Sequence, residues 1–107
     1  MILEINRDNF ETEVLQSEHP VLLDFWGPKC QPCLALMPAV EELGKEYDGK
    51  LKIVKVNAAE NRMLCARLRV MSLPSFLLYK DGVEVKRIGG DTITRKDLVE
   101  IIRTVLT

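Results

Sequence analysis

The sequence predicts an α/β fold in which a central mixed β-sheet is flanked by helices. Two features of the pattern lead to this fold class. Strand-like segments alternate with amphipathic helical segments, which favours parallel pairing of the strands. Residues 75–89 differ, because two strand-like runs there are separated only by Asp81-Gly82, a pair typical of an antiparallel hairpin with a type I′ turn. The predicted order of elements is β-α-β-α-β-α-β-β-α.

The size and composition of the chain indicate one globular domain, spanning residues 1–107. Apolar residues make up 47% of the chain and charged residues 29%, and the formal net charge is -1. This near-balanced charge gives no reason to expect nucleic acid or an anionic membrane as a partner. The first residues lack the features of a secretory signal, so we expect a cytoplasmic protein.

The first two elements are short. Residues 3–6 have the pattern of a short strand. Asp8 and Glu11 have the spacing of a capping box, so a short amphipathic helix should begin there and end near Pro20.

The segment 21–26, VLLDFW, is almost continuously apolar, which is typical of a central strand covered on both faces. A long amphipathic helix should follow, with Pro38 kinking it. The predicted inner face of this helix consists of Cys33, Met37, Val40, Leu43 and Tyr47.

The second half of the chain continues the alternation. Residues 51–57 predict a strand and 60–68 a helix. In the hairpin the alternation slips at 86–88, where we expect a β-bulge. Thr94 and Asp97 have capping-box spacing and should open the last helix. Its predicted inner face consists of Leu98, Ile101, Ile102 and Val105.

Two cysteines, Cys30 and Cys33, lie where the predicted central strand turns into the long helix. The sulfur of Cys30 would face the unpaired N–H groups and the positive dipole of the helix N-terminus. Both favour a thiolate, and Lys29 adds a positive charge. Pro32 suits the first helical turn, where its missing N–H costs no hydrogen bond. Cys33 lies one turn further on the same face, within reach of a disulfide and turned inward, an arrangement suited to thiol–disulfide exchange.

Two other interpretations of the CxxC compete with a redox pair. A zinc site needs four ligands, and the remaining candidates, Cys65 and His19, do not have ligand spacing. Two cysteines can also pack as small inert apolar residues. Their position at a strand–helix junction favours the redox interpretation, which requires no metal and no cofactor. We expect Cys65 itself to be a buried spectator on the 60–68 helix; a regulatory or dimer-forming thiol is the alternative, because the number of cysteines is odd.

The sequence resembles the thioredoxin family. The stretch VLLDFWGPKCQPCLALMP is similar to that family's strand, Trp, CxxC and kinking proline, with CQPC in place of the usual CGPC. The resemblance continues through VKVNAAEN, MSLPSFLLYKDGVEV and RIGG, and so covers essentially the whole chain.

The resemblance implies a role for several residues. Cys30 would be the nucleophile and Cys33 the resolving thiol, with Trp26 packed beneath them. Pro74 would be cis, next to the disulfide, and the Leu73 backbone would bind an extended substrate peptide through main-chain hydrogen bonds. The predicted substrate-binding set is Trp26, Lys29, Gln31, Pro32, Leu73, Pro74 and Gly89.

Asp24 matches the family's buried carboxylate. Its apolar neighbours should raise its pKa, which would suit a proton shuttle to or from Cys33. On chemistry alone, a structural ion pair with Lys55 explains Asp24 equally well; the resemblance favours the proton-transfer role, with Lys55 also in the site. Gly89 is either a point of close approach for a partner chain or an ordinary bulge or strand-end glycine.

Three positions depart from the family pattern. Lys29 replaces the usual Trp and adds a charge, Gln31 replaces the usual Gly between the cysteines, and Met71 stands beside the proline loop. The residues inside a CxxC shift the reduction potential, but the sequence gives neither sign nor size. These departures bear on partner choice more than on the chemistry.

The sequence therefore predicts a monomeric protein dithiol–disulfide oxidoreductase. Its partners would be disulfide-containing target proteins and an electron donor resembling thioredoxin reductase. Two alternatives remain open at this point: a binding module whose disulfide is not turned over, and an oxidase- or isomerase-biased thiol enzyme.

Overall fold

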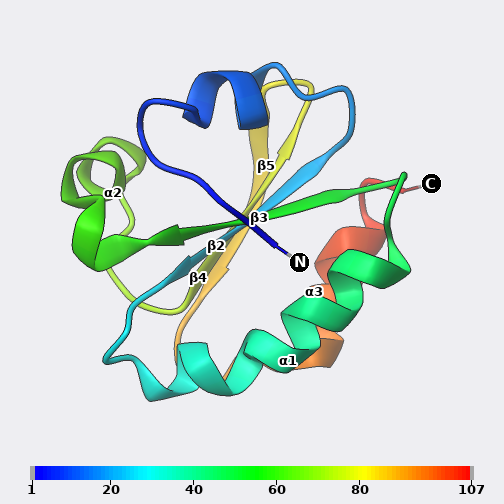
Figure 1. The fold of residues 1–107 in the computed structure, drawn as a ribbon. Helices are drawn as coiled ribbons and strands as arrows, with labels where there is room; N and C mark the ends of the chain where they lie inside the picture. Colours follow the sequence, from blue (N-terminus) through cyan, green and yellow to red (C-terminus); the bar gives the residue numbers. More distant parts are fainter. Residues whose placement is uncertain (1, 107) are drawn as a thin grey trace.

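Five strands form one twisted sheet in the order β1-β3-β2-β4-β5 (Figure 1). The computed structural model describes residues 2–106. β1, β3 and β2 are parallel, whereas β4 runs antiparallel to β2 and β5 antiparallel to β4, so the predicted mixed sheet is confirmed. The strands are β1 (Leu3–Glu4), β2 (Val21–Trp26), β3 (Lys52–Asn57), β4 (Ser75–Lys80) and β5 (Val83–Gly89).

Helices cover both faces of this sheet. In Figure 1, α1 and α3 lie together on one side, and α2 and the short turn η1 lie on the other. Each side has its own apolar cluster of buried side chains. No helix within residues 2–106 has the length and apolar character needed to cross a membrane. The helical elements are η1 (Glu11–Leu15), α1 (Gln31–Glu46), η2 (Ala58–Glu60), α2 (Arg62–Leu68) and α3 (Arg95–Arg103).

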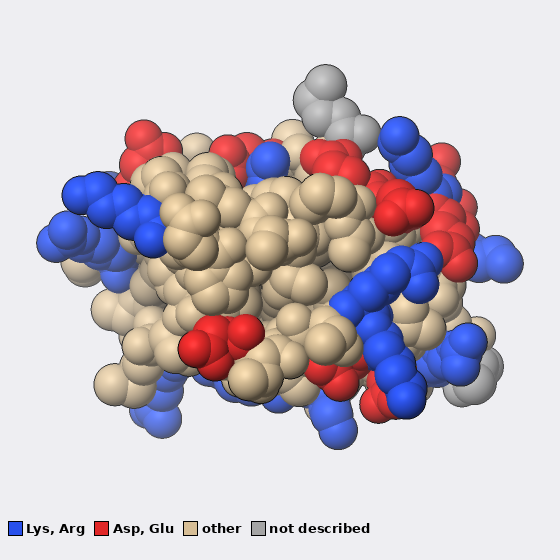
Figure 2. All heavy atoms as spheres, turned by 90° about the horizontal axis from the view of Figure 1, so that it is seen from below, with Lys and Arg blue, Asp and Glu red and all other residues tan. Residues whose placement is uncertain are grey.

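Figure 2 views the molecule from below, from the side of α1 and the turn that precedes it. Uncharged atoms form a broad band across the middle of this face, and most charged side chains lie at its margins. The band matches the α1 sequence, which carries no charged residue between Gln31 and Val40.

β2 is the central strand, as its apolar sequence predicts. Its residues 21–25 are all buried. Because side chains alternate along a strand, Leu22 packs with the α1 and α3 cluster and Leu23 with the α2 and η1 cluster. Asp24 follows Leu22 on the α1 side, where its exposed fraction is only 1%. The predicted central strand therefore carries one carboxyl group into the core.

The N-terminal elements differ from the prediction. β1 ends at Glu4, and η1 is a π-helical turn without a side-chain cap, so the capping box of Asp8 and Glu11 is wrong. Asn6 and Asn9 make the local hydrogen bonds instead. Asn6 Oδ1 accepts from the N–H groups of Asp8 and Asn9, and Asn9 Oδ1 accepts from the Asn6 N–H. Short amide side chains bond readily to nearby backbone, which explains this arrangement.

Most of the remaining elements agree with the sequence. On α1, Cys33, Val40 and Leu43 are buried, and the helix continues through Pro38. β3 starts at Lys52. A 3-10 turn, η2, precedes α2, which therefore starts two residues later than expected. Residues 81 and 82 both have positive φ, as a type I′ turn requires. The capping box of α3, between residues 94 and 97, is confirmed.

The bulge in the hairpin lies just before the predicted position. Leu78 pairs with Lys86 but Tyr79 pairs with Glu84, so Val85 is the extra residue. β5 is an edge strand on which Val85 is exposed, whereas Ile88 packs against the α1 and α3 cluster. The extra residue thus lets Ile88 face the core.

Arg87 on β5 ties the sheet edge to the end of α2. Its guanidinium donates to the carbonyl oxygens of Leu68 at 2.8 Å and Arg69 at 3.0 Å, and it pairs with Glu84. These carbonyls lie at the C-terminus of α2, where backbone acceptors lack helical partners. Arg87 thereby fixes the start of the loop that leads to Pro74.

Replacing Arg87 should therefore destabilise the fold more than a neutral surface change does. We expect Arg87→Met to lower the free energy of unfolding by about 1 to 2 kcal/mol, because two carbonyls lose a charged donor. Urea denaturation at pH 7 measures this. Lys86→Met is the matched control, since it removes a cation from an exposed neighbouring position on β5. Equal losses in the two variants would refute the role given to Arg87.

Candidate functional site

The two cysteines of the CxxC form a disulfide at the start of α1. Cys30 is the N-cap residue, with φ -95° and ψ 100°, and its Cα lies 5.3 Å from that of Cys33. The Cys33 N–H donates to Cys30 Sγ at 3.2 Å. Cys30 is partly exposed, whereas Cys33 has an exposed fraction of 2%. The predicted pair of an accessible and a sheltered sulfur is therefore present.

The local sequence explains why the Cys30 sulfur occupies this position. The Cys30 N–H donates to the Gly27 carbonyl at 3.0 Å, closing a tight turn directly after β2. Pro32 lies in the first helical turn, where backbone N–H groups have no intrahelical acceptor. The sulfur thus receives one N–H bond and lies at the positive end of the α1 dipole, and both favour a negative charge on it.

Asp24 is the buried titratable group of this region. Burial raises its pKa from an ordinary 3.8 to about 7; the positive charge of Lys55 lowers it, and the negative charge of Glu4 raises it. Its Oδ2 receives no hydrogen bond from any described residue. Lys55 is the β3 register partner of Asp24, but no direct ion pair joins them among the described residues. The burial of Asp24 agrees with the predicted rise in its pKa, and within residues 2–106 no close ion pair joins it to Lys55.

Trp26 ends β2 and contacts residues of the two neighbouring parallel strands, β1 and β3. Its Nε1 donates to Glu4 Oε2 at 2.9 Å, and Lys55 Nζ lies 5.8 Å from the centre of its ring. Glu4 was not among the site residues predicted from the sequence. Its position follows from the pairing of β1 with β3, in which Glu4 is opposite Lys55. An expected parallel edge strand could therefore have suggested it.

The loop before β4 lies beside the disulfide. The Leu73–Pro74 peptide bond is cis, as the family resemblance implied. Leu73 lines the same hollow as Cys30. Gly89 pairs with the first residue of β4, and a Cβ there would lie 3.1 Å from Ser75 Oγ and 3.3 Å from Ser72 Oγ. Gly89 is thus a strand-end glycine that lets the chain's own proline loop approach closely.

Comparison with known proteins agrees with this geometry. The thioredoxin family model matches residues 1–104. The chain belongs to the thioredoxin family. It is 39% identical over 102 residues to a thioredoxin of Peptoclostridium acidaminophilum, covering 95% of this chain and 93% of that protein. It is 46% identical over 90 residues to a thioredoxin of Haemophilus influenzae, covering 83% and 84% of the two chains. With its CxxC disulfide, the chain is a dithiol–disulfide oxidoreductase.

The hollow at the disulfide brings together some of the predicted substrate-binding residues. Lys29 and Leu73 line it beside Cys30, whereas Gln31 is exposed on the first turn of α1 outside it. The opposite wall comes from η2 and the first residue of α2, Arg62, and sequence reasoning missed it. The sequence could have indicated this wall, because the carboxyl ends of parallel β2 and β3 meet at one edge of the sheet. The complete lining is Gly27, Pro28, Lys29, Cys30, Ala58, Ala59, Arg62 and Leu73.

Cys65 is less buried than the sequence predicts. It is half-buried and lines a second hollow next to the first, together with Met71, whose exposed fraction is 93%. Burial still raises the pKa of the Cys65 thiol. Among residues 2–106, no three His, Cys, Asp or Glu side chains are grouped as metal ligands.

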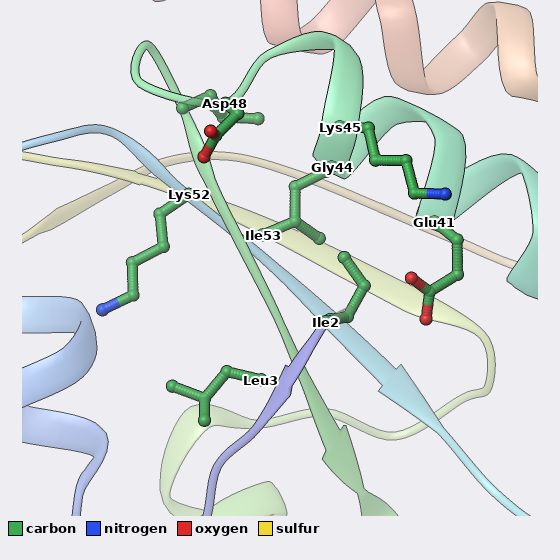
Figure 3. Close-up of a pocket in the computed structure, with 9 residues that line it drawn as sticks. Ile2, Leu3, Glu41, Gly44, Lys45, Asp48, Lys52 and Ile53 are labelled. Atoms are coloured by element: carbon green, nitrogen blue, oxygen red, sulfur yellow. The ribbon is translucent and has the colours of Figure 1, made fainter.

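A further hollow lies at the other end of α1 (Figure 3). It is lined by Ile2 and Gly44, so it is about 20 Å along the helix from Cys30. Its charged side chains have both signs, and the Lys52 ammonium points away from it, where it bonds to Glu13. None of the predicted site residues lines this hollow, so the chemistry is concentrated at the N-terminus of α1.

The raised pKa of Asp24 gives a pH-dependent stability. Between about pH 4 and 7 the native carboxyl holds a proton that the unfolded chain releases, so its contribution to stability is lost as the pH rises through this window. We expect oxidised wild type to lose up to about 4 kcal/mol relative to Asp24→Asn between pH 4 and pH 8. Denaturant unfolding across this range measures the difference. Asp91→Asn, at an exposed loop aspartate, is the control and should track wild type. A constant difference between Asp24→Asn and wild type would contradict the burial argument.

Proposed function

We propose that Cys30 and Cys33 carry out the reduction of disulfides in target proteins, with Cys30 as the nucleophile and Cys33 as the resolving thiol. The observation that carries the assignment is the hydrogen bond from the Cys33 N–H to Cys30 Sγ at the N-terminus of α1. It favours the thiolate at the more exposed of the two sulfurs. The sheltered sulfur is then left for the second, intramolecular step.

The reaction proceeds in two exchanges. The Cys30 thiolate attacks one sulfur of the target disulfide, forming a mixed disulfide and releasing the other target sulfur as a thiolate. Cys33 then loses its proton and attacks Cys30 Sγ. This closes the Cys30–Cys33 disulfide and releases the second target thiolate. Two electrons pass to the target, and the two target thiolates take up protons as their own pKa values dictate.

Asp24 serves this second step in our proposal. A carboxyl whose pKa is about 7 is partly ionised at neutral pH, so it can accept the Cys33 proton and return it on re-reduction. Both residues belong to the layer between the sheet and α1, where solvent is excluded. Lys55 limits the rise of the Asp24 pKa and so keeps the carboxyl near the working pH.

The target segment would bind across the disulfide and the proline loop. The Leu73 backbone would pair with an extended target peptide, since it borders the hollow that contains Cys30. The proposed contact residues are Trp26, Lys29, Gln31, Pro32, Leu73 and Pro74.

We infer that residues 1–107 act as one monomeric domain in the cytoplasm. The protein would accept electrons from a donor resembling thioredoxin reductase and pass them to target proteins. A single CxxC and a near-neutral net charge support this assignment.

Reduction of insulin by dithiothreitol tests the catalytic pair. Wild type should accelerate the precipitation of the insulin B chain, and Cys30→Ser should reduce the rate to that of dithiothreitol alone, since the nucleophile is lost. Cys33→Ser should accumulate the mixed disulfide, detectable by mass spectrometry. Cys65→Ser is the control thiol and should keep the wild-type rate. If Cys30→Ser and wild type give the same rate, the proposed role of Cys30 fails.

A further inference from the structure

The hollow beside Cys30 has a one-sided charge. Of its lining residues only Lys29 and Arg62 are charged, and both are cationic. They come from opposite walls: Lys29 precedes α1, and Arg62 begins α2. Both side chains are exposed, and within residues 2–106 neither forms an ion pair or a side-chain hydrogen bond. Two cations without an ion-pair partner therefore lie on either side of Cys30, the sulfur that a target disulfide must reach.

The nearby carboxylates do not neutralise this pair. Arg62 also lines a third hollow together with Asp8 and Glu60, but within residues 2–106 neither carboxylate forms an ion pair with it. Glu60 instead accepts a hydrogen bond from Asn57 Nδ2, and Asp24 is buried within the sheet. Both cations are therefore available to a bound segment.

The hollow continues into the neighbouring one, with which it shares Ala58, Arg62 and Leu73. That second hollow has no further charged residue, and apolar side chains such as Val70 and Met71 form much of its wall. Together the two hollows form a groove whose charged residues, Lys29 and Arg62, lie around Cys30 and whose far arm is apolar. This pattern complements an extended segment with acidic side chains near its cysteine.

We propose that Lys29 and Arg62 determine the substrate preference of the enzyme, selecting disulfides flanked by Asp or Glu. This inference rests on the proposed function of Cys30, because it assumes that the target sulfur is attacked there. The occupant is a protein segment carrying a carboxylate close to its disulfide-bonded cysteine. Lys29 and Arg62 act here as specificity residues and take no part in the transfer of electrons.

The expected effect is moderate and depends on salt. Solvent-exposed charge pairs are weak one at a time, so each cation should change the rate by about two- to fivefold. Together they should make the reduction of an acidic substrate about tenfold faster than that of a basic substrate at low ionic strength. The preference should shrink at about 0.5 M salt, where the screening length is only a few ångströms.

Three disulfide-linked synthetic peptides test this, identical except for Glu, Gln or Lys on each side of the cysteine. The fully reduced protein is mixed with each peptide, and the released peptide thiol is measured after acid quench. Each rate is divided by the rate of dithiothreitol on the same peptide, which removes the intrinsic effect of the flanking charge on the disulfide. Wild type should give a Glu-to-Lys ratio of about ten at low salt.

The double variant Lys29→Gln and Arg62→Gln should bring this Glu-to-Lys ratio to about one to two. Any loss of rate that is common to the three peptides, such as weaker stabilisation of the Cys30 thiolate without Lys29, cancels in this ratio. The Gln peptide also reports whether the variant is folded and active. The control is Lys50→Gln with Lys80→Gln, which makes the same charge change at the other end of the sheet and should keep the wild-type ratio.

Two results would overturn the preference: a wild-type ratio near one, or an unchanged ratio in the Lys29 and Arg62 double variant. Failure to reduce any of the three peptides has a different meaning. It would contradict the proposed chemistry of Cys30 and remove the basis of the preference with it.

Discussion

The burial of β2 on both faces is the constraint on which the site depends. Because β2 pairs with β3 on one side and β4 on the other, its side chains have only the two apolar layers to enter. The chain can leave this sheet only at its edge, and the tight turn after Trp26 sends it directly into α1. The Cys30 sulfur is therefore held at a helix N-terminus, where the backbone supplies an N–H group and a positive dipole. The reactivity of the pair follows from the position of the strand.

The same burial places a carboxyl group where an apolar side chain would be more stable. Asp24 lies in the α1 layer, and Lys55 and Glu4 act on its pKa in opposite directions from the neighbouring strands. A close ion pair would keep Asp24 ionised and leave it unable to hold a proton at neutral pH. A cation that is near but not bonded leaves the pKa near 7. The arrangement therefore gives up stability in favour of a group that can exchange protons at the working pH.

Particular residues show how far the sequence determines the structure. The Asp81-Gly82 turn, the capping box of residues 94 and 97 and the buried strand 21–26 were predictable, because each is specified by neighbouring residues. The mutual bonds of Asn6 and Asn9 and the bulge at Val85 were not, since a local hydrogen bond or the packing of Ile88 decides them. In the site, the cysteines and Asp24 could be assigned from sequence and family resemblance. Glu4 and Arg62 were missed, because strand pairing and the η2 turn bring them to the site from distant parts of the chain, and only the order of the parallel strands indicates their positions.

The surface around the disulfide and the buried layer beneath it have separate tasks. In our proposal the buried Asp24 and Cys33 exchange protons, whereas the exposed Lys29 and Arg62 meet the partner. Burial of β2 should keep the Asp24 carboxyl protonated well above the pH range in which an ordinary aspartate ionises. This can be measured by an NMR titration of the Asp24 carboxyl carbon in the oxidised protein. We expect a midpoint near pH 7, and a midpoint near the ordinary aspartate value of about 4 would contradict the proposed effect of burial.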